Sequence, residues 1–219
     1  MRESVSLDRL WFGLTFIAIG IGLVLQVALV GAADEGHFAT PLSRMFNLFF
    51  FFTILSNILL GFSCLLLYLN PCRTSTAFRV LRLTGLIGIA VTGVVFHGIL
   101  KERIDLHGWS RLADVVLHTF APIAGVLGWL IFGPRRLITP RVVGLTVIFP
   151  AVYGAVTVIR GEIVNWYPYF FMNPDENGYG HVALYSVVIA ILFVGLAAGA
   201  HELDDWLSSM RDAPDHVPA

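Results

Sequence analysis

Charged residues are scarce in this sequence. They make up 13% of the 219 residues, whereas a soluble domain usually carries about 25%. Hydrophobic residues account for 57% and gather in long runs, so the composition indicates that lipid is the solvent for most of the chain. The formal net charge is −1 and no basic stripe is present. We therefore expect no nucleic acid as a partner.

Cysteine is nearly absent, and the familiar motifs of soluble enzymes are missing. Cys64 and Cys72 are too few for a disulfide framework, and no metal-ligand spacing surrounds them. Residues 201–206 combine a histidine with three acids, a pattern more typical of a solvated helix end than of a metal site. No G-x-S-x-G, H-E-x-x-H or P-loop motif occurs. The sequence thus predicts no metal and no cofactor.

Six stretches approach or exceed the roughly 20 apolar residues that a membrane helix needs. They cover residues 10–32, 43–69, 79–100, 113–133, 142–160 and 181–201. The first run is longer than the apolar part of a signal peptide, which has about 7–15 residues, and we interpret it as a span. No internal repeat and no soluble segment interrupts the pattern. The prediction is an all-α protein, a single six-helix membrane domain over residues 1–219.

The loops differ in their content of basic residues, and this difference predicts the orientation. With the N-terminus inside, the cytoplasmic segments hold nine arginines and the other side holds five basic residues. Loops 70–79 and 134–141 contain basic residues and no acid, as the positive-inside rule requires. We expect a multi-pass protein of the cell membrane with both termini in the cytoplasm. Residues 202–219 are expected to form a short acidic, solvated tail.

The longest predicted connection, residues 161–180, is rich in aromatic side chains. Its first half contains Trp166, Tyr167 and Tyr169 beside Pro168. Trp and Tyr gather where a membrane meets water, so one interpretation is an interfacial anchor. The other is a lid over the outer mouth of the bundle.

Ionisable residues at membrane depth are costly and tend to mark function. Asp114 precedes His118 by four residues, which places both on one helix face. A carboxylate there can fix the tautomer of a histidine and raise its basicity. For Asp114 alone, a contact with lipid headgroups is the simpler interpretation. His97 lies near the outer end of the third span.

The second span carries a second polar pair, Thr53 and Asn57, again four residues apart. A threonine in a membrane helix commonly bonds to its own backbone, but an amide in hydrocarbon needs partners. Counted at about 1.5 Å per residue, Thr53 lies roughly 15 Å below Ser43, and His118 roughly 8 Å below Ala113. Both are measured from the outer face, so the two residues meet if the second and fourth helices are neighbours.

Three segments resemble one known family in order and approximate spacing. They are Phe51-Phe52-Thr53-Ile54 with Ser56-Asn57, then Leu117-His118-Thr119 followed by Pro122, and finally Trp166-Tyr167-Pro168-Tyr169-Phe170. The chain resembles the androgen-induced protein family, which includes the androgen-dependent regulator of tissue factor pathway inhibitor, and in particular its bacterial six-span relatives.

This resemblance implies a reaction. Characterised animal members are intramembrane threonine hydrolases that cleave fatty acid esters of hydroxy fatty acids. Carried over by motif, Thr53 is the nucleophile and His118 the general base. A threonine hydroxyl needs such a base, and a neutral histidine can act as one near pH 7.

Supporting roles are expected for further residues, and a membrane lipid or lipid ester is the expected partner. Asp114 would orient His118, while Asn57, Trp129 and Tyr167 are the candidate oxyanion donors. Nothing in the sequence specifies an oligomeric state.

Two alternatives remain open at this point. In one, His118, Asp114 and His97 form a proton or substrate path in a small-solute transporter. Transporters often show inverted repeats with broken helices, and no such pair is visible. In the other, the protein is non-catalytic and its polar residues serve only helix packing.

Overall fold

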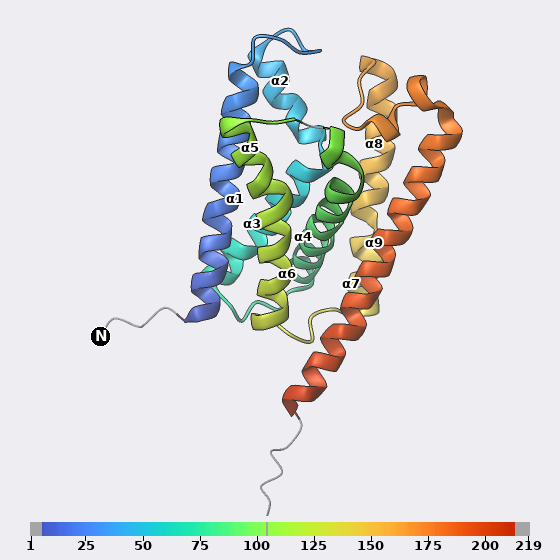
Figure 1. Ribbon diagram of the computed structural model, residues 1–219. Helices are drawn as coiled ribbons and strands as arrows, with labels where there is room; N and C mark the ends of the chain where they lie inside the picture. Colours follow the sequence, from blue (N-terminus) through green and yellow to red (C-terminus); the bar gives the residue numbers. More distant parts are fainter. Residues whose placement is uncertain (1–5, 104, 213–219) are drawn as a thin grey trace, which may run out of the picture.

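The computed structural model describes residues 6–103 and 105–212, and within them all regular structure is helical. Six helical segments are long and apolar enough to cross a membrane, as the sequence predicts, and the chain is a multi-pass membrane protein with an all-α fold. The first described helix starts, and the last one ends, at the lower end of the bundle (Figure 1). The six crossings are Leu7–Ala32, Phe52–Leu69, Thr76–Arg103, Gly108–Phe132, Pro140–Val164 and Pro174–Met210.

The second predicted span is not one continuous helix from residue 43 to 69. It consists of α2 (Pro41–Asn47), a 3-10 turn η1 (Leu48–Phe50) and α3 (Phe52–Leu69). Phe51 is extended, with φ −87° and ψ 128°, and this breaks the helical path. The depth that we counted along one helix is therefore wrong. Instead, Thr53 lies in the first turn of α3, where backbone N–H groups have no partner within the helix.

Two other crossings contain a widened turn. In the third, α4 (Thr76–Val95) passes through the π-helix η2 (Phe96–Leu100) into the 3-10 turn η3 (Lys101–Arg103). In the fourth, α5 (Gly108–Val115) and α6 (Ala121–Phe132) flank the π-helix η4 (Val116–Phe120). Pro122 explains η4, because proline offers no N–H to the carbonyl four residues earlier and its ring crowds that carbonyl. π-turns of this kind are frequent at functional sites.

Small residues bring the central helices together. A Cβ on Gly85 of α4 would lie 2.7 Å from the backbone nitrogen of Leu60 in α3, so these two helices pack backbone to backbone. A Cβ on Gly22 of α1 (Leu7–Ala32) would lie 2.7 Å from Val116 in η4. These close contacts pack α3 against α4 and α1 against η4.

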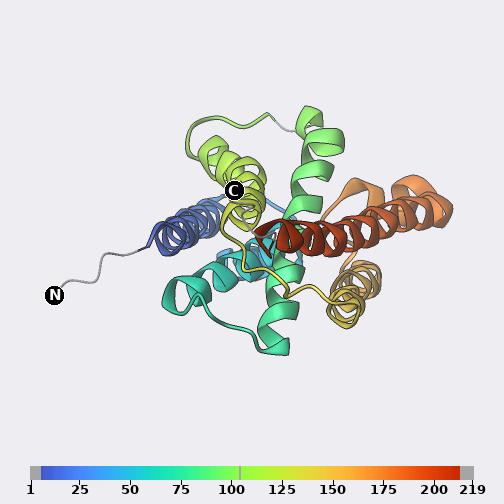
Figure 2. The ribbon, with the colours of Figure 1, turned by 90° about the horizontal axis from the view of Figure 1, so that it is seen from below.

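The last two crossings stand to one side at their upper ends, and the last one slants from there to the centre of the bundle at its lower end (Figure 2). They are α7 (Pro140–Thr146) with α8 (Ile148–Val164), and α9 (Pro174–Asp212). The long connection is shorter than predicted at its first end, since residues up to Val164 belong to α8. At its other end α9 begins at Pro174, but its helical path is interrupted at Gly178 (φ 73°, ψ 155°). Residues 165–173, with the 3-10 turn η5 (Phe170–Met172), remain as the loop.

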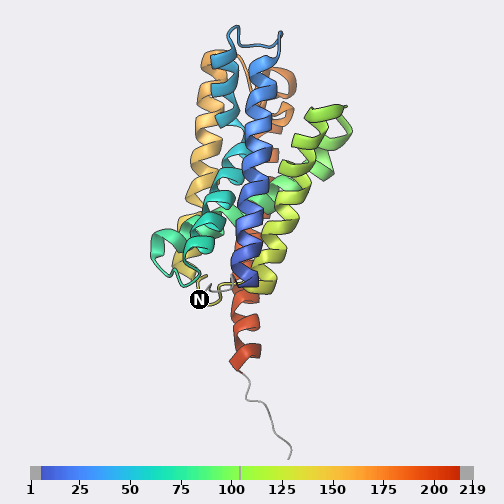
Figure 3. The ribbon, with the colours of Figure 1, turned by 90° about the vertical axis from the view of Figure 1, so that its left-hand side faces the viewer.

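The acidic tail also differs from the prediction. Helix α9 continues through residue 212 and extends beyond the lower end of the bundle (Figure 3). Asp204 is fully buried, and its Oδ2 accepts hydrogen bonds from the backbone N–H groups of Leu137 (3.2 Å) and Ile138 (3.5 Å). The first part of the expected solvated tail is thus a packed helix that holds the loop before α7. Residues 213–219 lie outside the described part of the chain.

Candidate active site

Thr53 presents its hydroxyl at the start of α3. The side chain is 6% exposed and lines a cavity in the upper half of the bundle. Its position in the first helical turn follows from the extended Phe51 immediately before this helix. The Thr53 N–H therefore points out of the helix rather than to a carbonyl within it.

His118 lies opposite Thr53, on the widened turn η4. The His118 Nε2 is 3.2 Å from the Thr53 Oγ1, although 65 residues separate them in sequence. Phe96 of η2 stacks on the imidazole with ring centroids 4.1 Å apart and planes at 19°, which restricts the ring's tilt. The two π-turns thus face each other and hold this histidine, and the predicted proximity of Thr53 and His118 is confirmed.

Asp114 completes a chain of polar contacts. Its Oδ1 lies 2.9 Å from the His118 Nδ1, and both side chains are mostly buried, at 17% and 19% exposure. A carboxylate accepts the proton of Nδ1–H, which leaves Nε2 unprotonated and able to accept the Thr53 hydroxyl proton. The order hydroxyl, imidazole, carboxylate is that of a Ser-His-Asp triad.

Asn57 links the two helical segments that carry the site, α3 and η4. Its Nδ2 donates to the carbonyl oxygens of Thr53 (2.9 Å) and Leu117 (3.1 Å). Because both partners are backbone acceptors, both amide hydrogens are committed. Asn57 therefore positions α3 against η4 and has no hydrogen left for an oxyanion, contrary to its predicted role as a donor.

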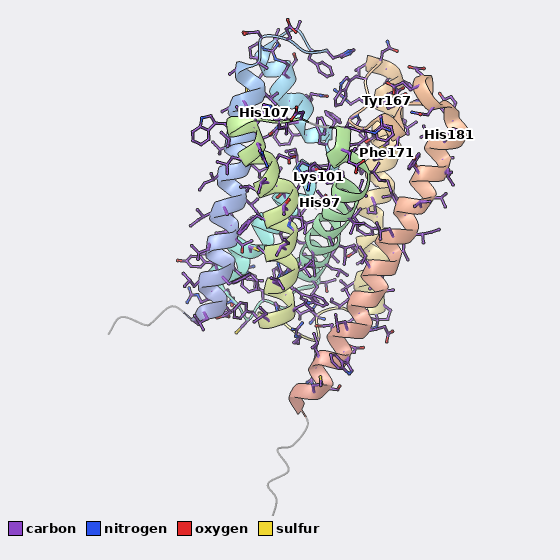
Figure 4. All side chains as sticks on the ribbon, viewed as in Figure 1. His97, Lys101, His107, Tyr167, Phe171 and His181 are labelled. Atoms are coloured by element: carbon purple, nitrogen blue, oxygen red, sulfur yellow. The ribbon has the colours of Figure 1, made fainter. Side chains whose placement is uncertain are left out.

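The other two predicted oxyanion donors lie away from Thr53. Tyr167 packs on Gly161 and donates to the Glu162 Oε1 at 3.0 Å, near the upper ends of α8 and α9 (Figure 4). Partial burial and this hydrogen bond to Glu162 raise the pKa of Tyr167 to about 12. Trp129 faces Arg135, close to the lower end of the bundle. The structure thus does not bring Tyr167 or Trp129 into the site.

Tyr169, which sequence reasoning missed, reaches the site instead. Its hydroxyl oxygen accepts a hydrogen bond from the Thr53 N–H at 3.4 Å. Burial raises the pKa of the Tyr169 phenol above its ordinary value, so this hydroxyl stays protonated at neutral pH. Tyr169 follows Tyr167 by two residues in the same aromatic segment. This segment was the feature of the sequence that could have identified Tyr169 as a site residue.

The loop 165–173 is docked on the upper end of the bundle. Trp166 packs edge-to-face on Phe38 (ring centroids 5.7 Å apart) and on Phe51 (5.5 Å). Tyr169 also packs edge-to-face on Phe51, at 5.9 Å. These contacts confirm that the segment packs over the mouth of the bundle near Thr53.

A cavity of about 420 Å³ adjoins Thr53 and Tyr169, between α3 and α4 on one side and α8 and α9 on the other. Its size lies in the range of small-molecule sites, about 300–1,000 Å³. The lining is mostly apolar and includes Val95, Pro150 and Phe193. A second groove, of about 670 Å³, runs along α3, α4, α7 and α8 and contains neither Thr53 nor His118 among its lining residues.

His97 forms a separate contact beside the site. Its Nε2 lies 3.1 Å from the Thr119 Oγ1, and the side chain sits at the upper end of the third crossing (Figure 4). Its hydrogen bond therefore links η2 to η4 without entering the Thr53–His118–Asp114 chain.

The described residues contain no group of three or more His, Cys, Asp and Glu side chains placed to hold a metal ion. Comparisons with protein-family models, with curated proteins and with solved structures find no match to this chain.

Proposed function

We propose that this protein is an intramembrane threonine hydrolase that cleaves lipid acyl esters. One observation carries the proposal: the chain Thr53–His118–Asp114 has hydrogen-bonding distances of 3.2 and 2.9 Å and ends on the wall of an apolar cavity. A nucleophile, a base within its reach and a third group that orients the base are the signature of covalent catalysis.

The reaction takes two steps. The Thr53 Oγ1 attacks the ester carbonyl carbon while its proton moves to the His118 Nε2, and the C–O bond to the alcohol then breaks as His118 returns the proton to the leaving oxygen. Water next attacks the acyl-threonine carbonyl, again giving its proton to His118. The C–O bond to Thr53 breaks, the proton passes to the Thr53 oxygen, and a fatty acid leaves.

The cavity supports a substrate with an acyl chain. Burial of a methylene group is worth about 0.8 kcal/mol, and the walls offer mostly hydrocarbon. The resemblance to the androgen-induced protein family points to fatty acid esters of hydroxy fatty acids or related lipid esters.

We further propose that the protein resides in the cell membrane with both termini in the cytoplasm. The end of the bundle where α1 begins carries the loops 70–79 and 134–141, which hold arginines and no acid. The active site then lies in the outer half of the membrane. Labelling of single cysteines placed in these two loops tests the orientation, and reaction with a membrane-impermeant maleimide on intact cells would contradict it.

The hydrolase proposal is tested on the purified full-length protein with long-chain acyl esters, including a fatty acid ester of a hydroxy fatty acid. Thr53→Ala and His118→Ala should each lower kcat by at least about 10³-fold. Thr15→Ala is the matched control, because Thr15 is also a buried helical threonine, but it donates to the Trp11 carbonyl oxygen and does not line the cavity. Absence of ester cleavage by the wild type, or full activity of both site variants, would overturn the proposal.

A further inference from the structure

We propose that the Tyr169 hydroxyl and the backbone N–H of Thr53 together form the oxyanion site of this enzyme. This inference rests on the proposed hydrolase function and adds the group that stabilises its transition state. Negative charge develops on the carbonyl oxygen when Thr53 attacks, and preorganised donors aimed at that oxygen are usually the largest single contribution to such catalysis.

The geometry of the two donors fits one acceptor. The Tyr169 oxygen and the Thr53 nitrogen are 3.4 Å apart, a long hydrogen bond. An oxygen placed between them on the cavity side can lie about 2.9 Å from both, which is a normal hydrogen-bond distance. The Tyr169 oxygen accepts from the Thr53 amide, so this contact does not use the phenol proton, and the O–H bond can rotate toward a substrate oxygen.

The position of Thr53 in helix α3 also supports the role of its backbone N–H as an oxyanion donor. Thr53 lies in the first turn of an 18-residue helix, where N–H groups lack carbonyl partners and the helix dipole favours negative charge. The nucleophilic hydroxyl and one oxyanion donor, the backbone N–H, therefore come from the same residue. Thr53 thus contacts both the carbon and the oxygen of the ester carbonyl.

Tyr169 is held rigidly enough to act as a preorganised donor. Its ring stacks on Phe171 with centroids 5.2 Å apart and planes at 3°, and it meets Phe51 edge-on. Both Tyr169 and Phe171 line the cavity that also contains Thr53 on its wall. An ester whose acyl chain occupies this cavity thus brings its carbonyl oxygen to the Tyr169 hydroxyl.

The experiment compares Tyr169→Phe with the wild type in two assays on the purified protein. One measures ester hydrolysis. The other measures covalent labelling by a long-chain alkyl fluorophosphonate, in which Thr53 attacks phosphorus, fluoride leaves, and the phosphoryl oxygen occupies the oxyanion site. Tyr185→Phe is the matched control, since Tyr185 packs on the same Phe171 ring and also loses only a hydroxyl.

Loss of one oxyanion donor lowers kcat by about 10²–10³-fold in other hydrolases. We expect a loss of this size in kcat and in the labelling rate of Tyr169→Phe, with KM and thermal stability near wild type, and no change in Tyr185→Phe. Retention of both rates within about threefold would overturn the inference. Equal labelling of Thr53→Ala and the wild type, or no labelling of either, would instead overturn the hydrolase proposal, and this inference with it.

A second variant keeps the test decisive if Tyr169→Phe folds poorly. Replacement of Tyr169 by 3-fluorotyrosine retains the shape of the side chain but makes the phenol more acidic. Because a phenolate cannot donate a hydrogen bond, activity should fall at a lower alkaline pH than in the wild type. An unchanged alkaline limb of the pH profile would show that Tyr169 donates nothing to the reaction.

Discussion

Each end of the bundle holds a carboxylate that is mostly or fully buried, and the two carboxylates have different surroundings. At the lower end, Asp204 is completely enclosed, accepts two backbone N–H groups and lies 3.8 Å from Arg135. At the upper end, Asp114 contacts His118, which in turn contacts a hydroxyl on a cavity wall. The lower carboxylate fastens one loop to one helix. The upper one orients an imidazole toward a hydroxyl that lines a cavity. Adjacent space, rather than burial alone, therefore distinguishes a candidate site from a structural contact.

The largest expected effect on the difference between the two ends comes from neutralising Asp114. Asp114→Asn should lower kcat by about 10³–10⁴-fold, because an amide no longer selects the tautomer with an unprotonated Nε2. Thermal stability should change little, since the side chain keeps its size. Hydrolysis kinetics measure the effect. Asp105→Asn is the control, because Asp105 also neighbours a histidine, His107, but both are exposed. Equal activity of the two variants would remove Asp114 from the mechanism.

The corresponding change at the lower end should affect stability instead. Asp204→Ala leaves Arg135 without its buried carboxylate and removes the acceptor for two amides, at a cost of about 3–5 kcal/mol. We expect a clear drop in the melting temperature in detergent, with kcat of the remaining folded protein unchanged. Asp205→Ala, at an exposed neighbouring position, should melt like the wild type. If Asp204→Ala instead retained its stability and lost activity, the two ends would be coupled.

The cavity itself can be narrowed without touching the polar chain. Gly154 of α8 lines it, and no atom lies within 4 Å of a Cβ added there. Gly154→Leu should shift the preference toward shorter acyl chains, with kcat/KM for long chains lowered by about 10–100-fold. Leucine also favours a helix over glycine. Activity over a series of ester chain lengths measures the shift.

The control for the cavity variant is Gly195→Leu on α9. Gly195 also has open space around it and is not among the lining residues of the cavity. An unshifted chain-length profile in Gly154→Leu would mean that the acyl chain binds elsewhere, for example in the larger groove beside α7.

The smallest effect is expected at His97. This histidine bonds Thr119 outside the chain of contacts, so His97→Gln should change kcat by less than about threefold. The transporter alternative assigns His97 a place on a proton path. A large loss of function in this variant, in an ion-flux assay on proteoliposomes, would favour that alternative over the hydrolase.

Residues of the candidate site were predictable from sequence to different degrees. Thr53 and His118 came from motif resemblance, and Asp114 from its four-residue spacing to His118, which a helix converts into proximity. Asn57 was identified from sequence as a supporting residue and a candidate oxyanion donor. Only the structure shows that Leu117, on another crossing, takes its second amide hydrogen. Tyr167 was named as a candidate and Tyr169 was not, although both lie in one aromatic segment. The packing of the loop decides which of the two rings turns toward Thr53.

The sequence by itself determined the six crossings, because the transfer of each apolar stretch into lipid depends on composition and length and not on neighbours. Only the tertiary structure decided the break at Phe51, the burial of Asp204 and the 3.2 Å contact between Thr53 and His118. These depend on the packing of helices distant in sequence, where small residues set how closely backbones approach. Local sequence patterns carry no information on how closely the backbones of two helices approach.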